Sequence, residues 1–284
     1  MDNIAFALAL GASFSWGLSL TVNKLCAGRI NATTFNTVQY LILTAIMTPL
    51  VLMTGLVPGS TWAVLMALTY GVFWIFVGSQ IFYYCLERAP AHVVVPISNT
   101  AAIWAVFFSA LLLSENIGLA VPLSLPFIII GIVLMSPKRE PGKKGPRSAI
   151  ILAVVVALIF GMMQTSRKTA VTDGIGATTF LWIAGLTGTS LLALTGLLRS
   201  SFRGQRLDGY SIGVSATAGL GQVVGGILYL MALALANASA VAPVTASIIP
   251  FGFLLSIPLL RERPTKKAVA GVATIFAGVV IATL

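Results

Sequence analysis

The stretch GSQIFYYCLERAPAHVVVPISNTAAIWAVFFSALLLSEN, residues 78–116, returns in altered form as GGILYLMALALANASAVAPVTASIIPFGFLLSIPLLRER, residues 225–263. An offset of 147 aligns 78–134 with 225–281 without a gap. Identical residue types meet at three well-separated positions: Pro96 with Pro243, Glu115 with Glu262, and Gly131 with Gly278. Matches that keep their order along both copies indicate an internal duplication.

The duplication extends to the start of each half. The tetrapeptide Ala-Thr-Thr-Phe occurs at 32–35 and again at 177–180. An offset of about 144 pairs Trp16-Gly17 with Phe160-Gly161 and Lys24 with Lys168. Between the copies lies SPKREPGKKGPR, residues 136–147, the most polar stretch of the chain. We therefore predict a first repeat over 1–136, a basic linker over 137–147 and a second repeat over 148–284.

The composition places both copies in a membrane. Hydrophobic residues make up 58% of the 284 residues and charged residues 8%, whereas soluble domains carry roughly a quarter charged residues. A bilayer core needs about 20 apolar helical residues per crossing. That length divides the chain into ten spans: 4–23, 33–54, 63–86, 91–113, 118–136, 148–168, 176–198, 210–235, 239–260 and 267–284. The predicted fold class is an all-α integral membrane protein with ten transmembrane helices in two five-helix repeats.

Five spans per copy is an odd number, so the second copy must enter the membrane from the opposite side. The repeats are therefore inverted, as in many secondary transporters. Fifteen of the 17 basic residues fall on one side of the membrane, and Arg167 and Lys168 fall on the other. Because basic loops stay in the cytoplasm, both termini are predicted to be non-cytoplasmic. This distribution of the +10 net charge also argues against a nucleic-acid partner.

The ordered motifs resemble those of the ten-helix EamA-type carriers of the drug/metabolite transporter superfamily. The resemblance covers nearly the whole chain and depends on segments that recur in both halves: Ser15-Trp16-Gly17 with Lys24, Tyr84 through Pro96 to Leu113-Ser114-Glu115 and Gly131, and Tyr229 through Pro243 to Leu260-Arg261-Glu262 and Gly278. It implies a solute carrier of the bacterial inner membrane. Its cavity would be lined by spans 1–4 and 6–9, with spans 5 and 10 as peripheral supports.

Polar and aromatic residues within the spans are the candidates for binding a substrate, because polar groups in hydrocarbon must face protein or water. The candidates are Trp16, Trp74, Gln80, Tyr83, Tyr84, Ser98, Asn99, Trp104, Gln164, Gln222, Tyr229, Thr245 and Ser247. For the polar residues the alternative is hydrogen bonding between helices, and for the aromatic residues it is packing or anchoring at the interface.

Several residues near span ends have two interpretations. Pro96 and Pro243 lie in the first turns of spans 4 and 9, where they either start the helix or act as a gating hinge. Lys24 and Lys168 either extend toward the interface or bind an anion. Glu115 and Glu262 are interpreted as structural carboxylates at the interface, rather than as proton carriers.

The motifs that are missing narrow the function. The sequence has no P-loop, no zinc-ligand spacing and no nucleophile elbow, so we expect no enzyme, no cofactor and no metal. No Asp or Glu falls in the middle of a predicted span, which disfavours a lipophilic cation as cargo. The sequence predicts an alternating-access exporter of a neutral, zwitterionic or anionic metabolite such as an amino acid. The alternatives are a receptor or scaffold without transport, and a channel-like facilitator.

The expected partners are the lipid bilayer, the small-molecule cargo and a coupling ion such as the proton. The protein is expected to be a monomer or a homodimer.

Overall fold

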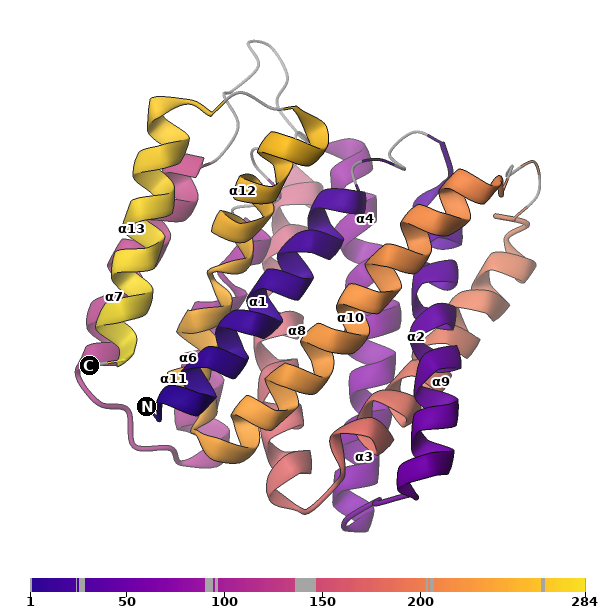
Figure 1. The fold of residues 1–284 in the computed structure, drawn as a ribbon, viewed down its shortest axis with the longest axis horizontal. Helices are drawn as coiled ribbons and strands as arrows, with labels where there is room; N and C mark the ends of the chain where they lie inside the picture. The colour runs from indigo at the N-terminus through magenta and orange to yellow at the C-terminus, as the bar shows by residue number, and fades with distance from the viewer. Residues whose placement is uncertain are drawn as a thin grey trace.

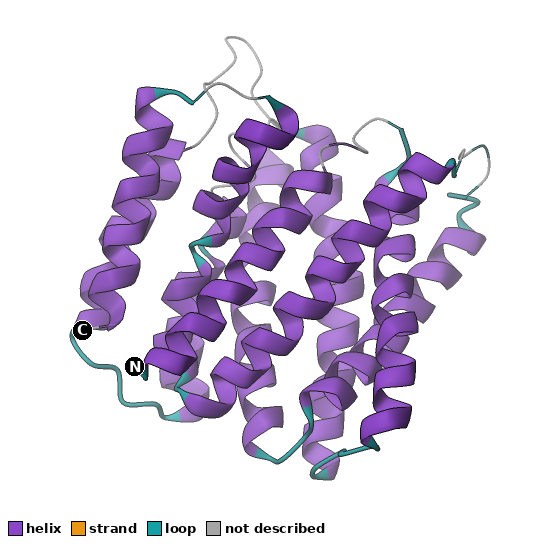
Figure 2. Ribbon diagram, in the orientation of Figure 1, coloured by secondary structure: helices purple, strands orange, loops and turns teal. Residues whose placement is uncertain are grey.

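The computed structural model describes residues 2–23, 25, 29–89, 94, 97–135, 147–202, 204, 207–261 and 264–283. These residues form helices joined by short loops and contain no strand, which confirms the predicted all-α class (Figure 2). Within these residues, eight helical segments are long and apolar enough to cross a membrane, and Ile97–Leu113 and Ala120–Met135 are shorter apolar helices. Parts of the chain considered above lie outside the described residues: Lys24, His92, Pro96, Glu262 and most of the linker.

The helices follow the predicted spans. In the first half they are α1 (Asn3–Asn23), α2 (Ala32–Thr54), α3 (Thr61–Tyr70), the π-helix η2 (Gly71–Gly78), α4 (Ser79–Arg88), α6 (Ala101–Leu113) and α7 (Ala120–Met135). In the second half they are α8 (Arg147–Thr172), α9 (Ala177–Leu198), α10 (Gly209–Leu235), α11 (Ala238–Thr245), α12 (Ile248–Leu260) and α13 (Lys266–Thr283).

Side-chain caps fix where three of these helices begin. The side chain of Asn31 accepts a hydrogen bond from the N–H of Thr34 at the start of α2. Ser60 and Asp208 cap α3 and α10 in the same way. Such caps satisfy backbone donors that have no partner inside the helix.

The predicted span 239–260 is broken rather than continuous. It ends as α11 at Thr245 and resumes as α12 at Ile248. Pro250 contributes to the break, because a proline has no N–H for the carbonyl four residues earlier and its ring clashes with that carbonyl. The first half interrupts its helix at the matching position, where Thr100 forms a turn. The counterpart of Pro250 in that half is Ile103, which is not a proline. The break is therefore a property of the repeat and not of one proline alone.

The packing of the two halves follows an approximate two-fold symmetry. A Cβ atom on Gly17 of α1 would lie 2.9 Å from Phe251 Cβ and 2.9 Å from the backbone nitrogen of Gly252 in α12. At the matching glycine of α8, Gly161, a Cβ atom would lie 2.5 Å from Trp104 Cβ and 2.9 Å from the backbone nitrogen of Ala105 in α6. Each half thus packs its first helix against the fourth span of the other half, as the duplication requires.

Figure 1 shows the resulting arrangement in space. α1 starts at the lower end of the bundle, whereas α8 starts at the upper end, so the two copies run in opposite directions. α7 and α13 pack together at one edge of the bundle, beside the other helices. Gly131 of α7 and Gly278 of α13 lie in this contact: added Cβ atoms would come within 2.8 Å of the Gly271 carbonyl oxygen and 3.0 Å of the Ser124 carbonyl oxygen.

The symmetry places α2 against α9, where Thr44 and Thr189 meet with their hydroxyl oxygens 3.3 Å apart. We predict that cysteines at these two positions form a disulfide under mild oxidation. The test uses a variant without the native Cys26 and Cys85 and with a protease site inserted in the linker. After cleavage the halves should migrate together on a denaturing gel until reductant is added. Halves that separate without reductant would contradict this packing, and Thr44→Cys alone is the control.

Candidate functional site

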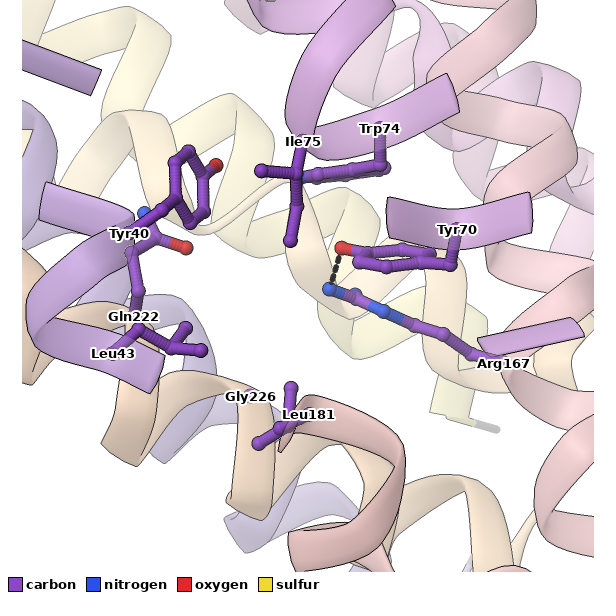
Figure 3. Close-up of a pocket in the computed structure, with 9 residues that line it drawn as sticks. All are labelled: Tyr40, Leu43, Tyr70, Trp74, Ile75, Arg167, Leu181, Gln222 and Gly226. Carbon is purple, nitrogen blue, oxygen red and sulfur yellow. Dashed lines mark hydrogen bonds between the residues drawn. The ribbon is translucent and has the colours of Figure 1, made fainter. Parts of the chain in front are cut away.

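A small pocket lies in the bundle between α2, α3, η2, α8, α9 and α10. Its walls come from both halves: Tyr40, Leu43, Tyr70, Trp74, Ile75, Arg167, Leu181, Gln222 and Gly226 (Figure 3). Leu43, Ile75 and Leu181 make part of the wall apolar. The polar groups come from the tyrosines, from Gln222 and from Arg167.

Arg167 is the central feature of this site. It belongs to α8, and only 3% of its surface is exposed. Its guanidinium donates a hydrogen bond to the hydroxyl of Tyr70 (Figure 3). It donates another to the side-chain oxygen of Gln164 at 3.1 Å. Its Nε atom is buried without a hydrogen-bond partner among the described residues.

Four aromatic rings surround the guanidinium. The Cζ atom of Arg167 lies 4.3 Å from the ring centre of Tyr70, 4.9 Å from that of Trp74, 5.0 Å from that of Tyr229 and 5.3 Å from that of Trp16. Cation–π contacts contribute about 0.5–2 kcal/mol each, most when water is excluded. We call these four residues the aromatic box.

The aromatic box compensates the buried charge only in part. No described carboxylate lies within ion-pair distance of Arg167, and arginine does not escape burial by losing its proton. An unpaired ion costs several kcal/mol to remove from water, and the ring faces offset part of this cost without supplying a counter-charge. The site is therefore suited to a negatively charged guest, which would supply the missing charge.

Close helix contacts hold the aromatic box in place. Tyr70 and Trp74 are one helical turn apart and stack with ring centres 5.3 Å apart at 16°. Trp74 lies in the π-helix η2, a conformation that is rare and often found at functional sites. A Cβ atom on Gly225 would come within 2.6 Å of the indole nitrogen of Trp16, so only a glycine at this position leaves room for the Trp16 ring.

Five of the thirteen predicted binding residues line this pocket or contact Arg167. Trp74 and Gln222 line the pocket, Trp16 and Tyr229 complete the aromatic box, and Gln164 bonds to Arg167. Trp104 packs against Gly161 of the neighbouring α8. The hydroxyl of Tyr229 is buried without a partner among the described residues.

The other predicted residues lie elsewhere. Gln80 donates to Thr33 Oγ1 at 3.3 Å. Tyr83 packs against Phe82, while Tyr84 is 41% exposed and lies under the guanidinium of Arg88, 3.7 Å from its ring centre.

The remaining candidates gather at the two helix breaks. Asn99 precedes the turn at Thr100, and Ser98 and Ser247 are buried with hydroxyls that have no partner among the described residues. Thr245 donates to the carbonyl of Ala242 at 2.6 Å. Pro243 is buried inside α11, just before the break.

Sequence reasoning missed Arg167, Tyr70 and Tyr40. The predicted span 148–168 made Arg167 a residue of the helix end, but α8 continues to Thr172, which places Arg167 inside the bundle. The polar-residue criterion would have selected it had the span been extended by one turn. The two tyrosines carried no comparable signal in the sequence.

Lys168 and Glu115 hold the turn between α10 and α11. Lys168 donates to the carbonyls of Leu233 and Ala236 at 2.7 and 2.9 Å. The carboxylate of Glu115 accepts the N–H groups of Ala238 and Ser239, both at 2.8 Å. This is the structural role favoured for Glu115 from the sequence, and Lys168 also serves as a structural contact.

Replacing Glu115 by alanine would leave two N–H groups at the start of α11 without acceptors. Losing the partner of a buried donor costs about 1–3 kcal/mol, so we expect the Glu115→Ala variant to melt several degrees below the parent in detergent. Glu115→Gln keeps one acceptor oxygen and should lose less. An unchanged melting temperature for Glu115→Ala would show that this contact does not stabilise the fold.

Loop contacts close the bundle at both ends. At the lower end in Figure 1, the loop before α3 meets the loop before α9. Ser60 Oγ donates to Asp173 Oδ2 at 2.9 Å, and the N–H of Gly176 donates to the carbonyl of Val57 at 2.8 Å. We call this set the lower closure.

The symmetry-related loops meet at the upper end. Asn31 Nδ2 donates to the carbonyl of Ser201 at 2.6 Å, and Arg29 pairs with Asp208 at 3.8 Å. We call this set the upper closure. Because both charged side chains of the pair are more than half exposed, the ion pair itself contributes little stability.

Within the described part of the chain, no group of three or more His, Cys, Asp or Glu residues is arranged to hold a metal ion.

The comparisons agree with this architecture. The model of the EamA-like transporter family matches residues 3–136 and 147–284. One solved structure, a crystal structure of a protein, has a TM-score of 0.81 and 17% sequence identity, and the match covers 100% of this chain and 97% of that chain. At that identity the likeness extends to the fold alone. A search of curated proteins gives no significant match.

Proposed function

The chain belongs to the EamA-like transporter family, and we propose that it is a secondary transporter that exports a small neutral, zwitterionic or anionic metabolite, such as an amino acid, across the bacterial inner membrane. Family membership makes it a membrane transporter of small molecules. The finer proposal depends on one observation, the buried pocket between the two halves of the bundle. Inverted-repeat transporters bind their cargo where the two repeats meet, near the middle of the membrane.

The two closures support alternating access as the mechanism. Each one joins a loop of the first half to a loop of the second half. Rocking of one half against the other would separate the loops at one end and leave those at the other end in contact. The breaks between α11 and α12 and at Thr100 give each half a point where a span can bend.

The electrostatics of the pocket support the proposed cargo class. The described residues of its lining include one arginine and no acidic residue. A lipophilic cation would have to enter beside the guanidinium of Arg167 without a carboxylate to pair with, so this class of cargo is disfavoured. Proton coupling, if it operates, would have to use groups outside the pocket lining.

The upper end of the bundle is proposed to face the cytoplasm. Arg29, Arg88, Arg199, Arg261 and Lys266 lie at helix ends on this side (Figure 1). Arg167, which the sequence assigned to the other side, is buried in the bundle and does not reach that surface. By the positive-inside rule both termini are then non-cytoplasmic. A reporter fused to the C-terminus should be active only outside the cytoplasm, and cytoplasmic activity would reverse the assignment.

The transport proposal is tested with purified full-length protein. Thermal melting in detergent against amino acids, organic acids, phosphorylated sugars, nucleotides and organic cations should identify a stabilising solute, since a ligand of the native state raises its melting temperature. That solute should then enter proteoliposomes with saturable kinetics and exchange across the membrane. Stabilisation without exchange would favour the receptor or scaffold, and flux without saturation would favour the channel-like facilitator.

A further inference from the structure

The cargo class can be narrowed from the surroundings of Arg167. We infer that the pocket binds the carboxylate of a small organic monoanion with an apolar or aromatic body, and that Arg167 is the residue that pairs with this carboxylate. The inference depends on the proposed function only in taking the pocket as the cargo site. Binding of a carboxylate to this pocket can be measured separately from transport.

The geometry of the guanidinium carries the first step. One terminal nitrogen of Arg167 donates to Tyr70 and the other to Gln164. The residue is 97% buried, and its Nε has no hydrogen-bond partner in the part of the chain that the structure describes. A planar guanidinium presents five N–H donors, in a fork that matches the two oxygens of a carboxylate. Tyr70 and Gln164 are neutral and accept only two of these hydrogen bonds. The other N–H donors and the positive charge of Arg167 therefore remain without a partner among the described residues.

The net charge of the pocket carries the second step. Arg167 is the only charged residue among the described residues that line the pocket. A monocarboxylate would make the occupied site neutral, whereas a phosphate dianion would leave an excess negative charge in the same low-dielectric space. A zwitterionic amino acid would bring an ammonium group that finds no carboxylate among the lining residues. A monoanion without a second charge is thus the best electrostatic match.

The remaining walls carry the third step. Leu43, Ile75 and Leu181 contribute aliphatic surface, and Tyr40 and Trp74 contribute ring faces (Figure 3). Pockets that bind small molecules combine such apolar walls with a few polar groups that fix the orientation.

The test uses three probes of nearly equal shape: phenylacetate, phenylacetamide and phenethylamine. Phenylacetate should raise the melting temperature of the detergent-purified protein by several degrees, and the neutral amide and the amine should not. In Arg167→Met the phenylacetate dissociation constant should rise at least tenfold. Arg167→Lys keeps the charge but loses the planar fork, so its affinity should fall between those of the parent and Arg167→Met.

Arg88→Gln is the matched control, since Arg88 also lies over an aromatic ring but is exposed at the end of α4. It should bind phenylacetate as the parent does. The inference is overturned if the amide stabilises as well as phenylacetate, if Arg167→Met binds phenylacetate unchanged, or if neither phenylacetate nor shorter carboxylates down to acetate bind. If Arg167→Met does not fold, the inference is tested by the affinity of Arg167→Lys for phenylacetate and by comparing the three probes on the parent protein.

Proteoliposome exchange separates this inference from the proposed function. Binding of phenylacetate without exchange leaves the carboxylate site in place and contradicts transport. Exchange of an uncharged solute that Arg167→Met leaves unchanged supports transport and contradicts the carboxylate site.

Discussion

A disulfide between cysteines at positions 60 and 173 should abolish transport, and reduction should restore it. The variant Ser60→Cys/Asp173→Cys replaces the two side chains whose oxygens are 2.9 Å apart in the lower closure. A covalent bond there would prevent the α2–α3 loop from leaving the α8–α9 loop. If that end must open in each transport cycle, the expected loss of flux is complete.

The measurement is exchange of the stabilising solute in proteoliposomes, before and after oxidation and again after reduction. It uses the background without Cys26 and Cys85. Ser60→Cys alone is the matched control and should transport equally in all three conditions. Undiminished exchange by a fully cross-linked protein would mean that the lower closure takes no part in the cycle.

The substitution with the largest expected effect on folding is Gly71→Leu. A Cβ atom at Gly71 of η2 would lie 2.6 Å from the carbonyl oxygen of Ala184 in α9. Gly188 of α9 makes the reciprocal contact: a Cβ atom there would lie 2.8 Å from the carbonyl oxygen of Gly71. Both contacts involve backbone atoms, which do not move aside as a side chain does. We expect a loss of about 3 kcal/mol or more of stability.

Gly213→Leu provides the control, because Gly213 lies in α10 with no atom within 4 Å of its Cβ position. The two variants are compared by size-exclusion profile and by thermal melting in detergent. Gly71→Leu should aggregate or melt far below the parent, while Gly213→Leu should stay close to it. Equal behaviour of the two variants would show that η2 and α9 are not packed backbone to backbone.

The topology was predictable from the sequence because it depends on patterns that survive uncertainty about detail. Apolar runs located the spans. The offset of 147 aligned Gly131 with Gly278, and both glycines lie in the contact between α7 and α13. Because each repeat has an odd number of spans, the second repeat must begin on the opposite side of the membrane from the first. None of these arguments requires knowing which face of a helix points inward.

The site was only partly predictable, because it depends on helix rotation and on where a helix ends. Gln80 and Tyr84 lie on the same span as Trp74, yet only Trp74 lines the pocket. The π-helix η2 changes the angular spacing in that span, and no residue type signals it. Arg167 was assigned to a helix end because the hydropathy of α8 falls just before its last turn, although the helix continues to Thr172.

The central claim, that the pocket opens to one side of the membrane at a time, is tested most directly at Gln222. A cysteine in place of this pocket residue is exposed to a membrane-impermeant maleimide, applied from either side of vesicles with the 60–173 disulfide formed or reduced. With the disulfide formed, labelling should occur only from the cytoplasmic side, and reduction should add labelling from the other side. Equal labelling from the non-cytoplasmic side in both conditions would contradict alternating access.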